Sequence, residues 1–279
     1  MRTAAALALL VACSSPRSST TPTTTPPPVT ENTPAATGPL TEAEFKALHA
    51  PPTSGPEKVN GERIDLKGTK AYLSLPAGKG PFPAIVVIHE WWGLNPNIEH
   101  WADRLASAGW AALAVDLYSG AVTTTPDAAM AAMKAVDPVK AKATIKTAID
   151  FLGSDPRVKA TTRAVIGWCF GGGWSLQTAL AEPEIQGAII YYGQLETDPA
   201  KLSAIKARLL GIFGTQDKGI PPEQVAKFDE ALKTAKVEHE IHSYDAPHAF
   251  ANPSNPKYDE TSAADAWTHV LAFLDKLKR

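Results

Sequence analysis

Six apolar runs, each bounded by glycine, proline or polar residues, recur along most of the chain. The middle runs are continuously apolar, which is typical of strands in a sheet that is covered on both faces. The strands that this pattern predicts are residues 81–90, 109–118, 163–168, 185–193, 207–214 and 237–244.

Helical periodicity lies between these strands. One predicted helix covers residues 139–154, and its apolar side chains share one face: Ala141, Ile145, Ala148, Ile149 and Leu152. A second lies near the C-terminus, with the same spacing at Ala263, Trp267, Val270, Leu271 and Leu274. The alternation of strand and helix predicts a single α/β domain with a mainly parallel sheet, helices on both faces, and a site at the carboxyl ends of the strands.

One segment breaks this alternation. Residues 62–76 read as two short strands around Lys67 and Gly68. We predict an antiparallel hairpin there, at the start of the domain.

The first residues of the chain have a different pattern. A single arginine precedes an apolar run over residues 3–12 that is too short to span a bilayer, which is typical of a signal peptide. The run ends in LVAC at residues 10–13, which resembles the lipobox of bacterial lipoproteins, in which the cysteine is lipidated and becomes the mature N-terminus. We predict a signal peptide over residues 1–12 and a lipid on Cys13.

The stretch after Cys13 is rich in Ser, Thr and Pro, and residues 14–38 contain almost nothing that could join a core. The sequence therefore predicts a disordered tether over residues 13–55 and a folded domain over residues 56–279. Such a protein is exported and held by its lipid on the cell envelope membrane of a bacterium, on the periplasmic side. We expect the domain to be a monomer.

Composition excludes one class of partner and raises a question about the cysteines. The net charge of −2 gives no electrostatic footprint for nucleic acid, so we expect no DNA or RNA partner. The chain has two cysteines, and with Cys13 lipidated Cys169 is the only thiol of the mature protein. A lone cysteine in an exported protein is either deeply buried or present for its chemistry.

Glycines surround Cys169 in GWCFGG, residues 167–172. Glycines this close to one side chain indicate a backbone turn too tight for Cβ atoms, as a nucleophile elbow between a strand and a helix requires. The alternative is that Cys169 is a small buried hydrophobic residue, as most free cysteines are.

Chain order supports the elbow. In the α/β-hydrolase arrangement the nucleophile is followed by an acid and then a histidine, each at the end of a strand. Asp217 and His248 occupy these places. Asp245 is the rival acid, but it lies only three residues before His248, which makes it awkward for its carboxylate to meet the imidazole.

The remaining histidines are weaker candidates. His89 ends a strand just before Glu90 and could support the site, whereas the others fall in predicted strands, helices or the tail. The HEWWG segment lacks the second histidine of HExxH, and no histidine pair has the spacing of a metal site. We expect no bound metal.

The chemistry follows from these residue types. An ordinary cysteine is mostly thiol at neutral pH, so it needs a base, and His248 oriented by Asp217 would supply one. Attack on a carbonyl builds an oxyanion, which needs N–H donors from the residue after the nucleophile and from the end of an earlier strand. These donors would be the amides of Phe170 and Trp91.

Five motifs now stand in order: HEWWGLN, DLY, GWCFGG, GTQD and PHAF. Together they resemble the dienelactone hydrolase family over almost all of residues 60–279, which implies the α/β-hydrolase fold. The resemblance implies a triad of Cys169, Asp217 and His248, and a glutamate, Glu90, that holds the resting thiol and moves aside when substrate binds. It implies neither a metal nor an organic cofactor.

The sequence departs from this family at two positions. Members that act on dienelactone carry an arginine two residues after the tyrosine of DLY and a serine after the catalytic histidine, and here these are Gly120 and Ala249. Without these donors an anionic lactone would be buried with its charge unpaired, so we expect a neutral substrate. Trp91 and Trp92 are candidates for lining its pocket.

Several other residues near the motifs are expected to be structural. Asp116 and Tyr118 end a strand and would support the site rather than react. Three further tryptophans, Trp101, Trp168 and Trp174, are expected to pack in the core.

Two hypotheses from different classes follow. The first is a membrane-tethered hydrolase of small esters or lactones that forms an acyl-cysteine intermediate. The second is a non-catalytic envelope protein that keeps the fold as a binding module. The complete set of Glu90, Cys169, Asp217 and His248 favours the enzyme, because a site that no longer catalysed a reaction would be expected to lose at least one of them.

Overall fold

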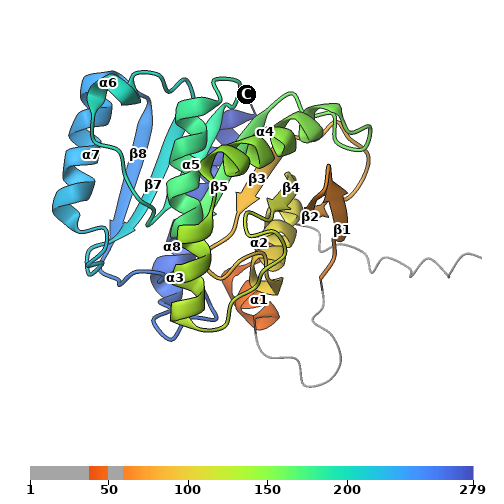
Figure 1. Cartoon of the computed structure of the whole chain (residues 1–279), viewed down its shortest axis with the longest axis horizontal. Coiled ribbons are helices and arrows are strands. Elements are labelled where there is room, and N and C mark those ends of the chain that lie inside the picture. The colour runs from red at the N-terminus through yellow and green to blue at the C-terminus, as the bar shows by residue number, and fades with distance from the viewer. Residues whose placement is uncertain (1–37, 50–58, 279) are drawn as a thin grey trace, which may run out of the picture. The chain divides into compact units, whose positions relative to one another are not determined.

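A twisted eight-stranded sheet forms the centre of the part of the chain that the computed structural model describes, residues 38–49 and 59–278 (Figure 1). In the sheet the strands lie in the order β1-β2-β4-β3-β5-β6-β7-β8. Their bounds are β1 Glu62–Leu66, β2 Thr69–Ser74, β3 Ala84–Ile88, β4 Ala111–Val115, β5 Arg163–Trp168, β6 Gly187–Tyr191, β7 Arg208–Gly214 and β8 His239–Tyr244.

Six of these strands, from β4 to β8 across the sheet, run parallel, whereas β2 is antiparallel to both β1 and β4. The predicted hairpin at residues 62–76 is therefore present as β1 and β2, with its turn at Lys67 and Gly68. Strand β8 is the edge strand at the far side, paired only with β7, and none of its residues is fully buried.

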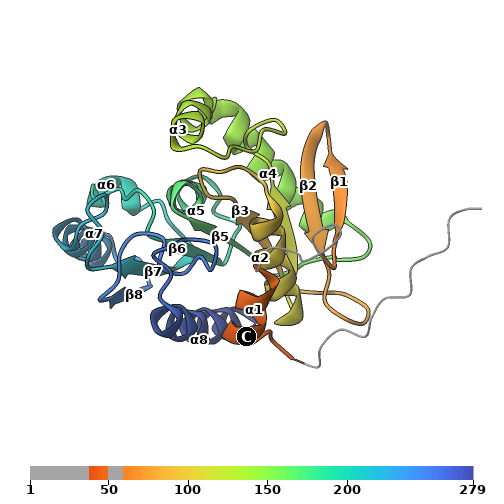
Figure 2. The ribbon, with the colours of Figure 1, turned by 90° about the horizontal axis from the view of Figure 1, so that it is seen from below.

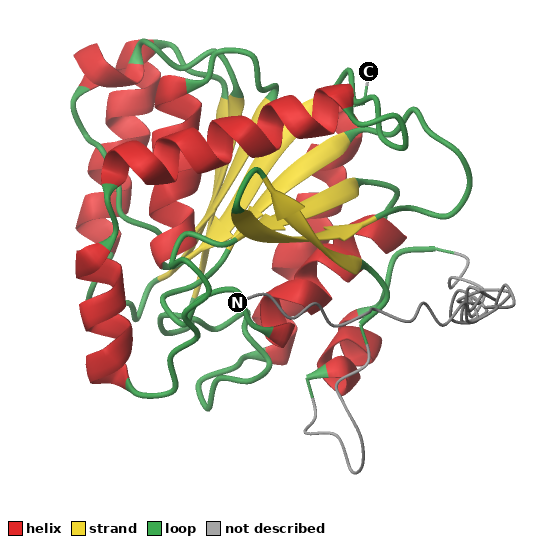
Figure 3. Cartoon of the chain, turned by 45° about the vertical axis from the view of Figure 1, so that its right-hand side comes forward, coloured by secondary structure: helices red, strands yellow, loops and turns green. Residues whose placement is uncertain are grey.

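Helices cover both faces of the sheet, as Figures 2 and 3 show. Helices α4, α5 and α7 pack their apolar side chains on one face, and α2 and α8 pack theirs on the other. The bounds are α1 Glu42–Leu48, α2 Pro96–Ser107, α3 Pro126–Ala135, α4 Pro138–Ser154, α5 Phe170–Ala181, α6 Pro199–Leu202, α7 Pro222–Ala235 and α8 Glu260–Leu277.

This layering explains the continuous apolar runs of the sequence. In β3, for example, Val86 packs with the α4 side while its neighbours Ile85 and Val87 pack with the α8 side, and all three are fully buried. The mainly parallel α/β fold that the pattern predicted is confirmed. The predicted strands are present with slightly shorter bounds, because their end residues belong to the loops.

The N-terminal segment corrects one prediction. Helix α1 lies inside the range predicted as a disordered tether, yet it begins with a capping box between Thr41 and Glu44 and buries Phe45 completely. The ring of Phe45 packs on Trp101 of α2, with centroids 4.2 Å apart. The tether prediction is therefore wrong for residues 41–49, because a capped helix, a buried aromatic ring and the ion pair of Glu42 with Arg104 dock the segment on the domain.

The other N-terminal predictions fall on residues that are not described. The signal peptide, Cys13 and the tether up to residue 37 lie outside the described residues, as does the predicted boundary between residues 55 and 56. Within residues 38–49 and 59–278, no helix has both the length and the apolar character that a bilayer span requires.

Candidate active site

Cys169 lies at the sharp turn between β5 and α5, with φ 55° and ψ −114°. Its neighbouring glycines make the turn possible, because a Cβ atom on Gly167 would lie 2.2 Å from the carbonyl oxygen of Gly171. A Cβ on Gly171 would lie 2.2 Å from the carbonyl oxygen of Ile88 at the end of β3. This backbone geometry matches that of a nucleophile elbow, and it presents a free, half-buried cysteine at the carboxyl end of the sheet.

His248 and Asp217 meet beside this elbow. The loop after β7 carries Asp217 and the loop after β8 carries His248, whose Nδ1 donates to Asp217 Oδ2 over 2.6 Å. The other carboxylate oxygen, Oδ1, accepts the backbone N–H groups of Gly219 at 2.8 Å and Ile220 at 3.1 Å. Asp217 is thus fixed on both oxygens and orients the imidazole.

The charges around His248 fit this arrangement. Burial lowers the pKa of His248, but hydrogen bonds to Asp217 and Cys169 and the charges of both outweigh burial and raise the pKa to about 10. For Asp217, burial raises the pKa, but the hydrogen bond and charge of His248 and the two backbone donors hold it below its usual value. Since Nδ1 is bonded to Asp217, Nε2 is the nitrogen left for Cys169.

The rival acid points elsewhere. Asp245 Oδ1 accepts from the Gln216 side chain at 3.0 Å and from the Thr215 hydroxyl at 3.4 Å. The structure therefore places Asp217, not Asp245, on His248.

Glu90 lies at the end of β3 and is buried. Its Oε2 accepts from the side-chain amide of Asn252 over 2.6 Å, and Asn252 Oδ1 accepts the backbone N–H of Ser254 at 2.9 Å. Burial raises the pKa of Glu90 to about 7, although the hydrogen bond from Asn252 and the charge of His248 act in the opposite direction. Asn252 was missed by the sequence reasoning; its one signal was a polar residue four positions after His248.

The two predicted oxyanion donors follow different strands, Phe170 after β5 and Trp91 after β3. Phe170 is the first residue of α5, so its N–H has no acceptor within the helix. Trp91 follows Glu90 in a turn that the N–H of Gly93 closes on the carbonyl oxygen of Glu90 at 3.3 Å. The rings of Trp91 and Trp92 lie 4.8 Å apart. Both residues are partly exposed, so their side chains are available to line a pocket.

Other residues near the motifs are structural, as expected. His89 is fully buried; its Nε2 accepts the N–H of Leu117 at 3.1 Å, and burial lowers the pKa of its imidazole to about 4. Asp116 accepts the N–H of Tyr118 at 2.7 Å and that of Gly120. The rings of Trp101 and Trp168 stack in the core at 4.5 Å, and Trp174 is partly buried against the core on the α5 side.

Gly120 and Ala249 both have left-handed backbones, with φ of 91° and 63°. A Cβ on Gly120 would lie 3.4 Å from the Nζ of Lys70, which the sequence reasoning did not consider. An ammonium group therefore lies next to the position at which dienelactone-cleaving members carry their arginine.

The described residues do not bring together a set of metal-ligating side chains. No group of three or more His, Cys, Asp and Glu side chains in residues 38–49 and 59–278 could hold a metal ion. The chemistry that these side chains can perform is proton transfer and nucleophilic attack.

A parallel sheet with a strained cysteine elbow, and an acid and a histidine in the loops after later strands, defines an α/β hydrolase. The sequence model of the dienelactone hydrolase family matches residues 69–278, and the chain belongs to that family. It is therefore a hydrolase of the ester and lactone class.

Known proteins agree with this assignment. A protein of Escherichia coli K12, provisionally named a carboxymethylenebutenolidase, is 31% identical over 228 residues, which cover 72% of this chain and 80% of the relative. A solved structure titled as a provisional dienelactone hydrolase of Klebsiella pneumoniae superposes with a TM-score of 0.72 at 25% identity, over 77% of this chain and 98% of that one. A dienelactone hydrolase-like promiscuous phosphotriesterase from metagenomic libraries gives 0.69 at 26%, over 78% and 97%.

Proposed function

We propose that this protein hydrolyses small, neutral esters or lactones through a covalent acyl-cysteine on Cys169. His248 is the general base and acid, and Asp217 orients it. The observation that carries the proposal is the hydrogen bond from His248 Nδ1 to Asp217 Oδ2, which orients an imidazole whose pKa is also raised by Cys169 at the elbow.

In the first half of the reaction the Sγ of Cys169 attacks the substrate carbonyl while its proton passes to Nε2 of His248. The carbonyl oxygen becomes an oxyanion, for which the N–H groups of Phe170 and Trp91 are the proposed donors. The carbonyl then re-forms, the bond to the leaving oxygen breaks, and that oxygen takes the proton from His248. In a lactone the leaving oxygen stays in the same molecule.

In the second half a water molecule attacks the acyl-cysteine and gives a proton to His248. The bond between carbon and Sγ breaks, and the proton returns to the sulfur as the carboxylic acid leaves.

The substrate preference rests on Gly120 and Ala249, whose side chains offer no donor to a substrate carboxylate. The ammonium of Lys70 beside Gly120 is the alternative source of positive charge. The rates of hydrolysis of p-nitrophenyl acetate, which is neutral, and p-nitrophenyl hemisuccinate, which is anionic, distinguish a preference for neutral substrates from one for anionic substrates. We expect the neutral ester to have the higher kcat/KM, and a strong preference for the hemisuccinate that Lys70→Met removes would overturn the neutral-substrate proposal.

The location is proposed from the sequence alone. A signal peptide over residues 1–12 and a lipid on Cys13 would place the hydrolase on the periplasmic side of the cell envelope, as a membrane-anchored monomer. Mass spectrometry of protein extracted from its native membrane should find a peptide that begins at acylated Cys13. An unmodified N-terminal peptide that contains Met1 would refute the anchor.

The decisive test of the chemistry is Cys169→Ala in the full-length protein. We expect kcat/KM for p-nitrophenyl acetate to fall by at least about 10³-fold, since a nucleophile acts as a unit with its base. Circular dichroism should stay unchanged, because the glycines and not the thiol build the turn. Cys169→Ala protein with full activity would exclude Cys169 as the nucleophile, and a wild type without turnover on any ester or lactone would favour the binding-module hypothesis.

A further inference from the structure

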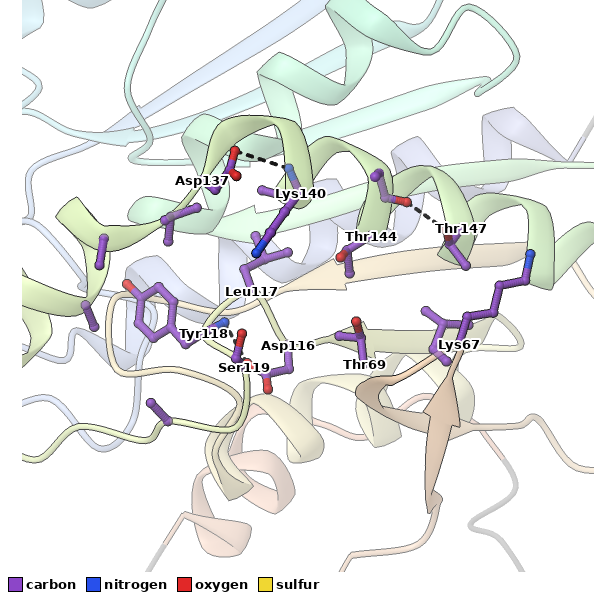
Figure 4. Close-up of a pocket in the computed structure, with 17 residues that line it drawn as sticks. Lys67, Thr69, Asp116, Leu117, Tyr118, Ser119, Asp137, Lys140, Thr144 and Thr147 are labelled. Carbon is purple, nitrogen blue, oxygen red and sulfur yellow. Dashed lines mark hydrogen bonds between the residues drawn. The ribbon is translucent and has the colours of Figure 1, made fainter.

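A cavity of about 610 Å³ lies away from the proposed catalytic residues, between the turn of the β1–β2 hairpin and helices α3 and α4 (Figure 4). Its floor includes Leu66 of the hairpin and Leu117 and Tyr118 of the loop after β4. Neither Cys169 nor His248 lines it. The cavity is therefore a separate concave site on the same domain.

Two lysines border this cavity without ion-pair partners among the described residues: Lys140 of α4 and Lys67 of the hairpin turn. Figure 4 shows the Lys140 side chain running from α4 toward Leu117, and Lys67 at the hairpin end. An ammonium group directed into a cavity can hold an anion.

The two carboxylates at the cavity are occupied by backbone donors. Asp116 accepts the N–H of Tyr118 at 2.7 Å, and Asp137 accepts the N–H of Val139 at 2.8 Å as the N-cap of α4. Asp137 also offsets the positive end of the helix dipole. Their charges remain near the cavity, which favours a single negative charge on a ligand over a double one.

One buried polar group of the lining lacks a partner. The hydroxyl of Tyr118 is inaccessible to solvent and makes no hydrogen bond to any described residue. Thr144 of α4 also presents its side chain to the cavity beside Lys140. Because the Tyr118 hydroxyl is closed off from solvent, the Thr144 hydroxyl beside Lys140 is the donor that remains for a ligand with acceptor oxygens.

The lining also has an apolar part, with Leu66, Leu117, Ala132, Ala135, Val136 and Ala141, beside the hydroxyl side chains of Thr69, Ser119 and Thr147. We propose that this cavity binds a short amphiphilic carboxylate, with its head on Lys140 and Thr144 and its alkyl chain on the apolar lining. A lining that mixes apolar side chains with a cation and hydroxyl groups suits a small ligand that has a charged head and a short apolar chain. The proposal does not depend on the thiol chemistry.

The test is calorimetric titration of hexanoate into the full-length protein with Cys13→Ser, in which Cys169 is the single thiol, after alkylation of that thiol with iodoacetamide. Alkylation blocks the proposed catalytic site, so binding that survives it lies elsewhere. We expect saturable binding that alkylation leaves unchanged. Hexanol, which has the same chain without the charge, should bind more weakly.

Lys140→Met is the diagnostic variant, and Lys142→Met, an exposed lysine of the same helix that does not line the cavity, is its control. We expect Lys140→Met to weaken hexanoate binding by roughly threefold to tenfold and Lys142→Met to leave it unchanged. Thr144→Val should weaken it by a smaller factor.

Three results would overturn the proposal. They are the absence of saturable binding, equal weakening by both lysine variants, and loss of binding on alkylation, which would place hexanoate at Cys169. Loss of esterase activity on alkylation tests the proposed function separately, because it concerns hydrolysis and not hexanoate.

Discussion

Two regions of this molecule bury ionisable side chains, and they use them differently. One is the candidate active site at the carboxyl ends of the strands. The other, here called the α2 cluster, consists of Glu99, His100, Asp103 and Arg104, four buried ionisable residues near the middle of helix α2. Both regions are sheltered from water, so burial alone does not distinguish them.

In the α2 cluster the charges hold distant segments together. Arg104 is fully buried, bonds Glu42 of α1 at 2.7 Å, and lies over the rings of Phe45 and Trp267. Asp103 accepts from the hydroxyls of Tyr72 at 2.7 Å and Ser74 at 2.6 Å. These partners lie on other elements, so the cluster fixes the arrangement of α1, α2 and β2.

In the candidate site Asp217 is fixed on both oxygens, but the histidine that it orients is held through one nitrogen only. The other nitrogen of His248 is left for Cys169, and Glu90 accepts its hydrogen bond from the neutral amide of Asn252. Burial raises the pKa of Glu90 to about 7, because it outweighs the hydrogen bond from Asn252 and the charge of His248. The comparison teaches that a candidate reactive group is one whose partners orient it and leave one atom unused.

The largest effect is expected from the acid that orients His248. Asp217→Asn keeps the shape of the side chain but removes its charge, and it can stabilise the wrong tautomer of His248. We expect kcat/KM to fall by about 10²- to 10⁴-fold. Steady-state hydrolysis of p-nitrophenyl acetate measures this, with Asp245→Asn as the matched control.

The control should change the rate by less than about twofold, since Asp245 contacts Thr215 and Gln216 and not the imidazole. Equal losses in both variants would mean that the loop, and not the carboxylate of Asp217, supports catalysis.

The next effect concerns stability and should leave the chemistry unchanged. Arg104→Met leaves Glu42 buried without its cation, and we expect the free energy of unfolding to fall by about 3–5 kcal/mol. Denaturant titration measures this, and kcat/KM of the remaining folded protein should match the wild type.

Lys46→Met is the control, because Lys46 also joins α1 to the body of the domain, through Glu260 at 2.6 Å, but both side chains are about half exposed. A surface pair of this kind contributes at most about 1 kcal/mol. An Arg104→Met protein as stable as Lys46→Met would refute the structural role of the α2 cluster.

The smallest effect is expected at Glu90 and depends on pH. Burial raises its pKa in the folded protein from 4.5 to about 7, so the folded state retains its proton when the unfolded state has lost it. Stability therefore falls as pH rises from about 4.5 to 7. Glu90→Gln removes this dependence, and its free energy of unfolding relative to wild type should rise by about 2–3 kcal/mol across the same window.

Glu230→Gln, an exposed carboxyl on α7, should show no such trend. The same Glu90→Gln protein tests the action of Glu90 on the thiol. With one negative charge fewer near Cys169, alkylation by iodoacetamide at neutral pH should be faster. Identical alkylation rates would remove Glu90 from the mechanism and leave the rest of the proposal intact.

The strands, the elbow and the positions of Asp217 and His248 could be predicted from the sequence, because they depend on local periodicity and on chain order. It could not give the order of the strands, in which β4 lies between β2 and β3. Nor could it reveal the hydrogen bond between Asn252 and Glu90 or the packing of α1 on α2, since both contacts join residues far apart in the chain. Long-range packing leaves little trace in a local pattern.

The position of β8 at the sheet edge has a consequence for how the enzyme fails on heating. His248 follows a strand that pairs on one side only and whose residues are never fully buried, whereas Cys169 follows the central strand β5. Edge elements open by local unfolding at lower cost than the core. We expect amide hydrogens of β8 to exchange before those of β5, and heated protein to lose its base, and with it hydrolysis, below the temperature at which the sheet melts.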